Sequence, residues 1–426
     1  MIIEKIELAA GRLSANRYLR ALRDGIILCM PLVIIGSVFL IIGNFPAESW
    51  ATFLKSQGIS PWLNKLVDGT FGIIGLVASF SIACSLTTSW QEDGLASGII
   101  SLSSYLILTP YLSGHSDGIT QAGYPLLYMG SKGIFAAILV SIVTARIFHF
   151  FMSRNIIIKM PEGVPPAVSR SFICLIPGFV TVLIAGIVQF VLVKVGAGNI
   201  HVLLATVMHT PLSFLGGTLP GTIIAVILNS LFWLTGIHPG GTINAVMTPV
   251  WLINTDQNRL ASVAGLELPN IITQPFMDNF VWMGGGGATI GLVICMFFFS
   301  TSRQNKTLGS LAILPGIFNI NEPLIFGLPI VLNLKMAIPF ILSPVVIAVV
   351  TYISMLYGWV HKPTGVSMPW TMPPLISGYF ATGGYISGSV IQLVGIILSA
   401  LIYYPFFRIV DKEQYQSESE KGEHHE

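Results

Sequence analysis

The distribution of charge along the chain constrains its fold more than any other feature of the sequence. Of the 426 residues, 40 are charged; eight of these lie between Glu4 and Asp24 and eight between Asp411 and Glu426, which leaves 24 for all the residues between. A soluble domain carries roughly 25% charged residues, so the central part of this chain cannot build a water-facing surface. The sequence therefore excludes a cytosolic enzyme, a nucleic-acid-binding protein and a disordered chain, and it indicates a polytopic membrane protein.

Nine segments are long and apolar enough to cross a bilayer, which takes about 20 mainly apolar residues. They are residues 25–43, 70–90, 95–112, 132–152, 171–195, 219–237, 284–301, 336–358 and 386–408. Basic side chains cluster before the first span, after the fourth and after the ninth, and the positive-inside rule places such segments in the cytoplasm. This pattern requires an even number of crossings, so we predict about ten, with both termini in the cytoplasm.

The two halves of the chain differ in kind. Up to residue 200 the apolar segments are regular, and we expect a scaffold of about five transmembrane helices there. From residue 201 to 410 the segments are interrupted by Gly, Pro and Asn, and polar residues lie at their centres. Within a membrane such backbone occurs only where it is buried in protein or lines a cavity, so we expect this half to hold the functional site. Residues 411–426 are expected to form a polar cytoplasmic tail.

Glu322 is the acidic residue that fits a solvated loop least well. It lies in KTLGSLAILPGIFNINEPLIFGLPIVLNLK (residues 306–335), where two short apolar stretches flank a centre rich in Pro, Gly and Asn. Gly permits sharp turns and Pro removes a backbone donor, so this pattern predicts a re-entrant hairpin with Glu322 at its tip. A carboxylate there could bind sugar hydroxyls, carry a coupling proton or form an ion pair with a neighbouring helix.

Two aromatic side chains add weaker signals. His238 ends an apolar segment and precedes Pro239, so it suits a hydroxyl group but also fits an ordinary place at the membrane interface. Trp370, in MPWTMPP, fits either the interface or stacking on a sugar ring. The glycine run at 284–287 lacks the Lys and Ser/Thr of a phosphate-binding loop, and close helix packing explains it better.

Six motifs follow one another in a fixed order along the chain. They are KMPEGVPPAVSRSF at 159–172, GIH at 236–238, MTP at 247–249, MDNF…GGGGATIGL at 277–292, FNINEPLIFGLP at 318–329 and PWTMPP at 369–374. Together they resemble the membrane component, enzyme IIC, of the lactose/cellobiose/chitobiose family of the bacterial phosphoenolpyruvate-dependent sugar phosphotransferase system (PTS). The resemblance covers nearly the whole chain, and the pair GIH and NEP in this order is its most specific part.

The resemblance implies a fold and an activity. It implies an all-α polytopic membrane protein of about ten transmembrane helices and two re-entrant hairpins, which forms a homodimer through its N-terminal half. Its C-terminal half would bind a β-linked disaccharide of the cellobiose, diacetylchitobiose or lactose class. A phosphocysteine on the separate IIB component would phosphorylate the C6 hydroxyl as the sugar is released inward.

The resemblance also assigns roles to five residues of this chain. Glu322 and His238 would lie near the C6 hydroxyl of the sugar. Asn321 would shape the hairpin tip, Asp278 would bind sugar hydroxyls, and Trp370 would stack on a sugar ring. GIHPGG departs from the commonest pattern of the family at Pro239, which bears on sugar specificity and on the local hairpin geometry.

The partners expected are a disaccharide, phosphorylated IIB with IIA, HPr and enzyme I upstream, a second copy of the chain and the lipids of the bacterial inner membrane. The stretch after Val410 contains no cysteine, so we expect IIB and IIA to be separate proteins and this chain to carry no phosphoryl donor. It would be the membrane subunit of an enzyme complex, with no bound metal or cofactor. A proton- or ion-coupled sugar symporter with Glu322 as the coupling group remains the alternative.

Overall fold

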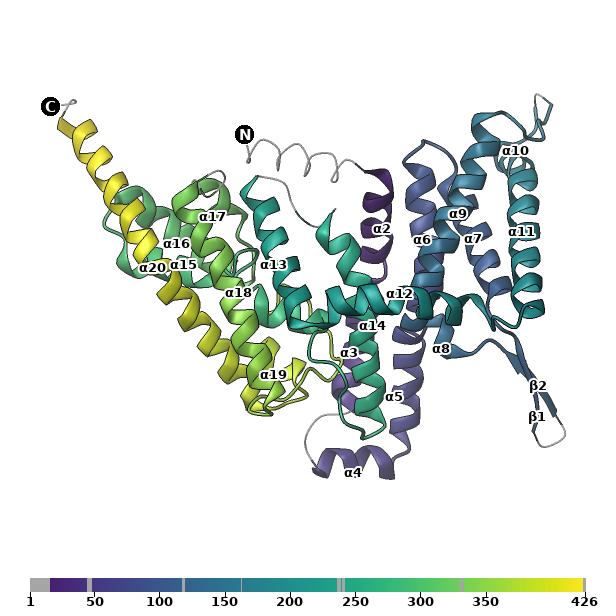
Figure 1. The fold of residues 1–426 in the computed structure, drawn as a ribbon, viewed down its shortest axis with the longest axis horizontal. Helices are drawn as coiled ribbons and strands as arrows, with labels where there is room; N and C mark the ends of the chain where they lie inside the picture. Colours follow the sequence, from purple (N-terminus) through teal and green to yellow (C-terminus); the bar gives the residue numbers. More distant parts are fainter. Residues whose placement is uncertain are drawn as a thin grey trace. The chain divides into compact units, whose positions relative to one another are not determined.

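The computed structural model describes residues 16–43, 48–116, 119–161, 163–235, 239, 242–328, 330 and 333–423. Over this part of the chain the structure is mostly helical (Figure 1). It divides into two compact units, which are described separately. The N-terminal unit lies within Leu13–Leu40 and Gly58–Ser213, and the C-terminal unit is formed mainly by Phe214–Glu426, with Ile41–Gln57.

The N-terminal unit is built on helix α6, against which α2, α7 and α9 pack. Small residues allow this close packing: a Cβ atom added to Gly25 would lie 2.5 Å from Cγ1 of Ile82. The elements that begin in this unit are α2 (Arg17–Ile27), α3 (Met30–Gly43), α5 (Ile59–Asp68), α6 (Ile74–Thr88), α7 (Gly94–Leu108), α8 (Leu126–Met129), α9 (Ile134–Ser153), α10 (Pro166–Ile173), α11 (Leu175–Lys194), α12 (Ile200–Gly217) and the strands β1 (Leu112–Ser116) and β2 (Ile119–Gly123).

The C-terminal unit is organised around its last helix, α20, which packs along α15 and α18 and also contacts α16 and α19 (Figure 1). Its apolar core includes Trp233, Phe340, Tyr403 and Phe407. The elements of this unit are α4 (Glu48–Ser56), α13 (Leu219–Leu234), α14 (Ile243–Val263), a short π-helix (Phe276–Val281), α15 (Ile290–Phe299), α16 (Arg303–Ile317), α17 (Glu322–Gly327), α18 (Leu334–Leu356), α19 (Ile376–Ala381) and α20 (Ile386–Glu423).

Each of the nine predicted spans overlaps an apolar helix or pair of helices. Six helical segments in the described residues are long and apolar enough to cross a membrane: Arg17–Gly43, Ile59–Thr88, Ser131–Ser153, Leu175–Lys194, Lys335–Leu356 and Ile386–Glu420. The other three predicted spans match the shorter apolar helices Gly94–Leu108, Leu219–Leu234 and Ile290–Phe299. The total of about ten crossings stays a prediction, and so do the homodimer and the roles assigned to the two halves of the chain.

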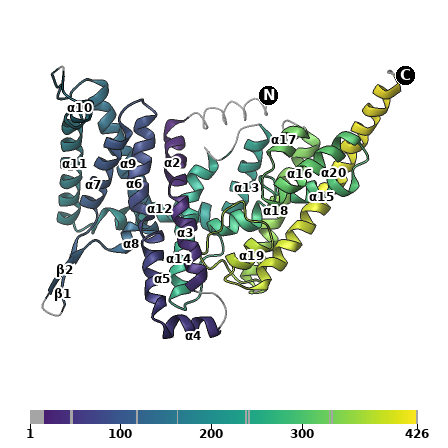
Figure 2. The same ribbon diagram turned by 180° about the vertical axis from the view of Figure 1, so that it is seen from behind.

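Three features were absent from the sequence-based expectation. Strands β1 and β2 form an antiparallel hairpin that projects from the helices of the N-terminal unit (Figure 2). Helix α14 (Ile243–Val263) occupies part of the region 238–283. Its polar residues pair with backbone groups; for example, Asn258 donates to the carbonyls of Asn270 and Pro363. The expected polar tail is helical as far as Glu423, as a continuation of α20.

Candidate functional site

The loop between α16 and α17, residues 318–321, is the hairpin tip from which the candidate site is described. Asn319 holds it in place from both ends of its amide: Oδ1 accepts from the Gly284 N–H at 2.7 Å, and Nδ2 donates to the Trp370 carbonyl at 2.6 Å and to the Met372 carbonyl at 3.2 Å. Its φ is 62°, a left-handed value that Asn adopts more readily than most residues. One buried amide therefore joins three segments that are distant in sequence.

Asn321 makes a second connection from the same loop. It is 3% exposed, and its Nδ2 donates to the Gly286 carbonyl at 2.7 Å and to Thr289 Oγ1 at 3.0 Å. Because both acceptors belong to or follow the glycine run, Asn321 fixes the hairpin tip against that run. Its place agrees with a residue that shapes the tip, and its role toward a sugar stays a prediction.

The glycine run at 284–287 is a turn that admits no larger residue. Gly284, Gly285 and Gly287 have positive φ angles. A Cβ atom on Gly285 would lie 2.5 Å from Cγ of Asn321, and one on Gly286 would clash with Nε1 of Trp233. Close packing around the hairpin tip, and not phosphate binding, accounts for the four consecutive glycines.

Asp278 lies on the π-helix and both of its carboxylate oxygens accept from Gln274 Nε2, at 2.9 and 3.0 Å. Four buried polar atoms in the same unit make no hydrogen bond within the described chain: Gln274 Oε1, both amide atoms of the neighbouring residue Asn279, and Nε1 of Trp251. Asn279 is 2% exposed. Buried polar groups are nearly always hydrogen-bonded, so these atoms are available to a ligand or to water. A polyhydroxyl ligand offers both donors and acceptors to such atoms.

The structure gives different amounts of information about the three remaining predicted site residues, Glu322, His238 and Trp370. Glu322 directly follows Asn321 and begins α17, so its backbone is placed at the end of the tip. His238 lies outside the described residues. The Trp370 side chain is 52% exposed, which leaves both of its interpretations open. Asn319, two residues before Asn321 in the same loop, donates to the backbone carbonyl of Trp370. The described contacts of Asn319 and Asn321 do not include Asp278.

Sequence reasoning missed Asn319, Gln274 and Asn279. The spacing of Gln274 and Asp278, four residues apart on one helical turn, was a readable signal. Asn279 stands inside the MDNF motif beside Asp278, where a second polar residue on an apolar helix could have been noted. The contacts of Asn319 join segments 35 and 51 residues away and have no local signature.

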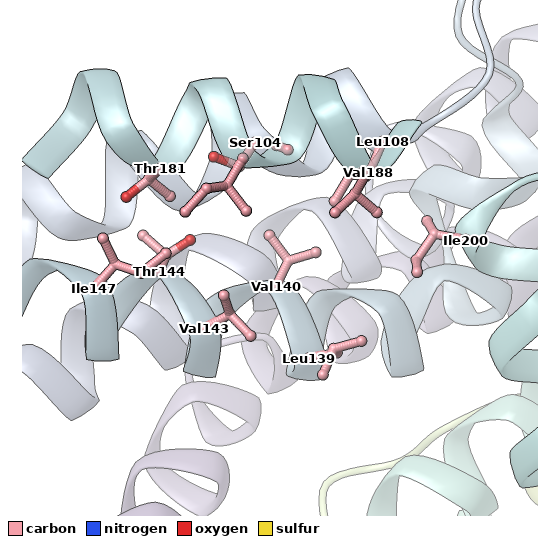
Figure 3. A pocket seen from close by; sticks show the side chains of 12 residues that line it. Ser104, Leu108, Leu139, Val140, Val143, Thr144, Ile147, Thr181, Val188 and Ile200 are labelled. Atoms are coloured by element: carbon pink, nitrogen blue, oxygen red, sulfur yellow. The ribbon is translucent and has the colours of Figure 1, made fainter. Parts of the chain in front are cut away.

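A cavity in the N-terminal unit does not suit a sugar. It has a volume of about 110 Å³ and lies between α7, α9 and α11 (Figure 3). Aliphatic side chains such as Leu139, Val140 and Val188 line it, and its polar residues are Ser104, Thr144 and Thr181. Thr181 donates to the Pro177 carbonyl of its own helix at 2.7 Å. With no amide or charged side chain in its lining, the cavity cannot satisfy the many hydroxyls of a disaccharide.

The described residues hold no group of three or more His, Cys, Asp or Glu side chains that could bind a metal ion. Cys29, Cys84, Cys174 and Cys295 are all free thiols, and none of them is exposed. The chemistry available in the described part of the site is therefore hydrogen bonding by amide, carboxylate and indole groups.

Long apolar helices, together with one unit in which glycine and asparagine turns interrupt the helices, define an integral membrane protein of the transporter class. The sequence model of the family "Phosphotransferase system, EIIC" matches residues 23–344. The chain belongs to this family, and is thus a IIC permease component of a bacterial sugar phosphotransferase system. The resemblance inferred from the six motifs is confirmed.

Individual relatives are similar to this chain over nearly its whole length. The chain is 47% identical to the lichenan permease IIC component of Bacillus subtilis (strain 168), over 98% of this chain and 94% of that protein. It is 45% identical to the cellobiose-specific EIIC component of Geobacillus stearothermophilus, over 97% and 94%. The crystal structure of ChbC, the IIC component from the N,N'-diacetylchitobiose-specific phosphotransferase system, superposes with a TM-score of 0.94 at 43% identity, over 98% and 99% of the two chains.

The contacts of Asn321 generate a first prediction. Replacing Asn321 with Asp removes the Nδ2 donor that serves Gly286 and Thr289, and should lower the free energy of unfolding by roughly 2 kcal/mol. The same substitution at Asn333 is a matched control, because Asn333 caps α18 with its Oδ1 acceptor, which Asp retains. Unfolding of the purified proteins in increasing SDS measures both. Equal loss of stability in the two variants would contradict the role given to the Asn321 amide.

Proposed function

We propose that this IIC permease binds a β-linked disaccharide in its C-terminal unit and presents the C6 hydroxyl for phosphorylation by a separate phospho-IIB protein. The observation that carries the proposal is the hairpin tip, where two buried asparagines fix the backbone on either side of Ile320 and directly before Glu322. The names of the relatives support the sugar class, since cellobiose and diacetylchitobiose are both β-1,4-linked disaccharides.

Glu322 would act on the hydroxyl that becomes phosphorylated. Its carboxylate, with His238, would accept the hydrogen bond of the C6 hydroxyl and orient its oxygen toward the phosphocysteine of IIB. The sugar oxygen then attacks phosphorus, the phosphorus–sulfur bond breaks, the IIB thiolate leaves, and the hydroxyl proton passes to the Glu322–His238 pair. The contribution of this chain is alignment of the acceptor, which can lower a barrier substantially without any covalent role.

The other polar groups of the C-terminal unit would hold the rest of the sugar. Asp278 would accept hydrogen bonds from hydroxyls, and the free polar atoms of Gln274, Asn279 and Trp251 would complete this polar set. Trp370, half exposed, would offer its ring to the apolar face of a pyranose. Movement of this unit would then carry the sugar to the inner side of the membrane.

We infer a wider assembly by analogy with the family. IIA, HPr and enzyme I would pass the phosphoryl group to IIB, and two copies of the chain would form a homodimer through their N-terminal halves. About ten transmembrane helices and two re-entrant hairpins would place both termini in the cytoplasm, at the inner membrane of a bacterium.

The proposal is tested with membrane vesicles that contain the chain, a labelled panel of cellobiose, diacetylchitobiose and lactose, and phospho-IIB with its upstream components. Sugar 6-phosphate should form only when both the chain and phospho-IIB are present. Accumulation of unmodified sugar in step with an imposed proton gradient, with no effect of IIB, would overturn the proposal in favour of a symporter that uses Glu322 for coupling.

Replacing Glu322 with Gln in these vesicles should lower the rate of sugar 6-phosphate formation about 100-fold, the range typical of a lost acid–base group. The matched control is Glu267→Gln, because the Glu267 side chain is 91% exposed and makes only a 3.3 Å contact with Lys362. Product formation by the Glu322 variant at the rate of the control would exclude a role of this carboxylate.

Because the side-chain amide of Asn279 is unpaired, we predict that its replacement lowers disaccharide affinity without lowering the stability of the chain. Replacing Asn279 with Leu removes two buried polar atoms that have no partner in the sugar-free chain, so the free energy of unfolding should stay unchanged or rise. Disaccharide affinity, measured by calorimetry, should fall about tenfold because one or two hydrogen bonds are lost.

Gln392 is the contrasting position for this prediction. Its amide is fully paired: Oε1 accepts from the N–H groups of Leu375 and Gly378, and Nε2 donates to the Asn279 carbonyl and Ser377 Oγ. Gln392→Met should therefore destabilise the sugar-free chain. If Asn279→Leu destabilised the chain equally, its amide would be structural and not a sugar ligand.

A further inference from the structure

The C-terminal end of α20 makes specific contacts with the start of α16. The helix does not stop at the end of the apolar segment but continues to Glu423, and in Figure 1 its last turns lie beyond α15 and α16. Asp411, the first charged residue after the apolar part of the helix ends at Val410, is completely buried. A buried carboxylate is stable only when hydrogen bonds replace its hydration, so its partners are informative.

All partners of Asp411 lie where α16 begins. Oδ2 accepts from the backbone N–H of Thr301 at 2.7 Å and from the Thr301 hydroxyl. Oδ1 accepts from the Ser302 N–H at 3.3 Å and from Asn305 Nδ2 at 3.0 Å. A single carboxylate on α20 thus binds three residues that precede or open a helix more than 100 positions away in sequence.

Glu418 continues this contact two helical turns further along the same face of α20. Oε1 accepts from Ser302 Oγ at 2.7 Å and from the Gln304 N–H at 2.9 Å, and Oε2 accepts from the Arg303 N–H at 2.9 Å. Gln414, between the two acids, donates to Gln304 Oε1 at 2.6 Å. Both carboxylates face the positive end of the α16 dipole, where negative charge is favourable.

Together these groups satisfy every free donor at the start of α16. The first N–H groups of a helix have no partner within it. Here Asp411 accepts from residues 301 and 302, Glu418 accepts from residues 303 and 304, and Ser302 Oγ accepts from Asn305 N at 3.2 Å. An ordinary cap needs one local side chain, so two carboxylates from a distant helix indicate a connection between helices.

The same helix α20 also forms hydrogen bonds with the backbone of the glycine turn and of the residues that follow it. Ser399 Oγ donates to the Ala288 carbonyl at 2.6 Å and accepts from the Gly291 N–H at 3.1 Å, and the Tyr403 hydroxyl donates to the Gly287 carbonyl at 2.8 Å. These groups flank the glycine turn to which Asn321 is bound. Helix α20 therefore contacts both the glycine turn and the beginning of α16, the helix that ends at the tip.

We propose that Asp411 and Glu418 are positioning residues, which hold α16 in register with the glycine turn and thereby place the hairpin tip and Glu322 for reaction. The placement of the hairpin tip by these two residues does not depend on the proposed function; only the expected effect on phosphorylation rests on it. When one carboxylate is lost, the start of α16 loosens, and the tip samples positions in which the C6 hydroxyl is misaligned. Asp278, Gln274 and Asn279 lie on a different segment, so sugar binding is largely retained.

The test uses the full chain purified in detergent, with the variants Asp411→Asn and Glu418→Gln. Glu420→Gln is the matched control, because Glu420 is exposed on the same turn of α20. Hydrogen–deuterium exchange should become about tenfold faster in peptides covering 318–328 in both variants, and stay unchanged over 276–283. In the vesicle assay, turnover should fall about tenfold while disaccharide affinity changes less than about threefold.

A purely structural role gives a different result. If the variants exchanged faster only at the end of α20 and the start of α16, with residues 318–328 as protected as in the control, the proposal would be overturned. A parallel loss of affinity and turnover would also overturn it. If Asp411→Asn fails to accumulate, the less buried Glu418→Gln still decides the question. The exchange measurement needs neither sugar nor IIB, so it stands even if the chain phosphorylates no disaccharide.

Discussion

The structure of the C-terminal unit depends on one requirement: where a helix is interrupted at membrane depth, the freed backbone groups must find partners within the protein. Lipid tails cannot supply them, and an unpaired buried group costs about 1–3 kcal/mol, more than the net gain of roughly 1 kcal/mol from an ordinary hydrogen bond. Here the partners are side chains from other segments. Asn319 and Asn321 serve the glycine turn, Gln392 serves the start of α19, and Ser399 and Tyr403 serve the backbone around residue 288.

The same amide chemistry distinguishes structure from ligand binding. Asn319 and Gln392 each use both ends of the amide, and they join segments that would otherwise be independent. Asn279 is equally buried but uses neither end of its side chain, although its backbone carbonyl accepts from Gln392. Under the proposed function, the sugar would supply hydrogen-bond partners to this amide, whose backbone is already held in place by Gln392.

What the sequence could predict follows from the range of each signal. Hydropathy depends on local sequence, so every predicted span overlaps an apolar helix in the structure. The six motifs were enough to identify the family. The re-entrant pattern around Glu322 was readable because Pro, Gly and Asn act on their own backbone. The roles of Asn319 and Asp411 were not, because their partners lie 35 to 110 residues away and only the folded chain brings them together. The polarity of the residues after Val410 suggested a tail. In the structure, the carboxylates of Asp411 and Glu418 in this stretch accept hydrogen bonds from the N–H groups at the start of α16.

Helix α20 explains why these distant connections belong to one arrangement. Along one continuous helix, Gln392 contacts the π-helix that carries Asp278, Ser399 and Tyr403 contact the glycine turn, and Asp411 contacts the start of α16. The segments that carry the groups proposed to bind the sugar and those proposed to orient its hydroxyl are thus both hydrogen-bonded to α20. Any shift of α20 relative to α16 must break charge-assisted hydrogen bonds in a buried position, where they are strong and costly to lose. The arrangement therefore resists changes in the alignment of these parts relative to one another.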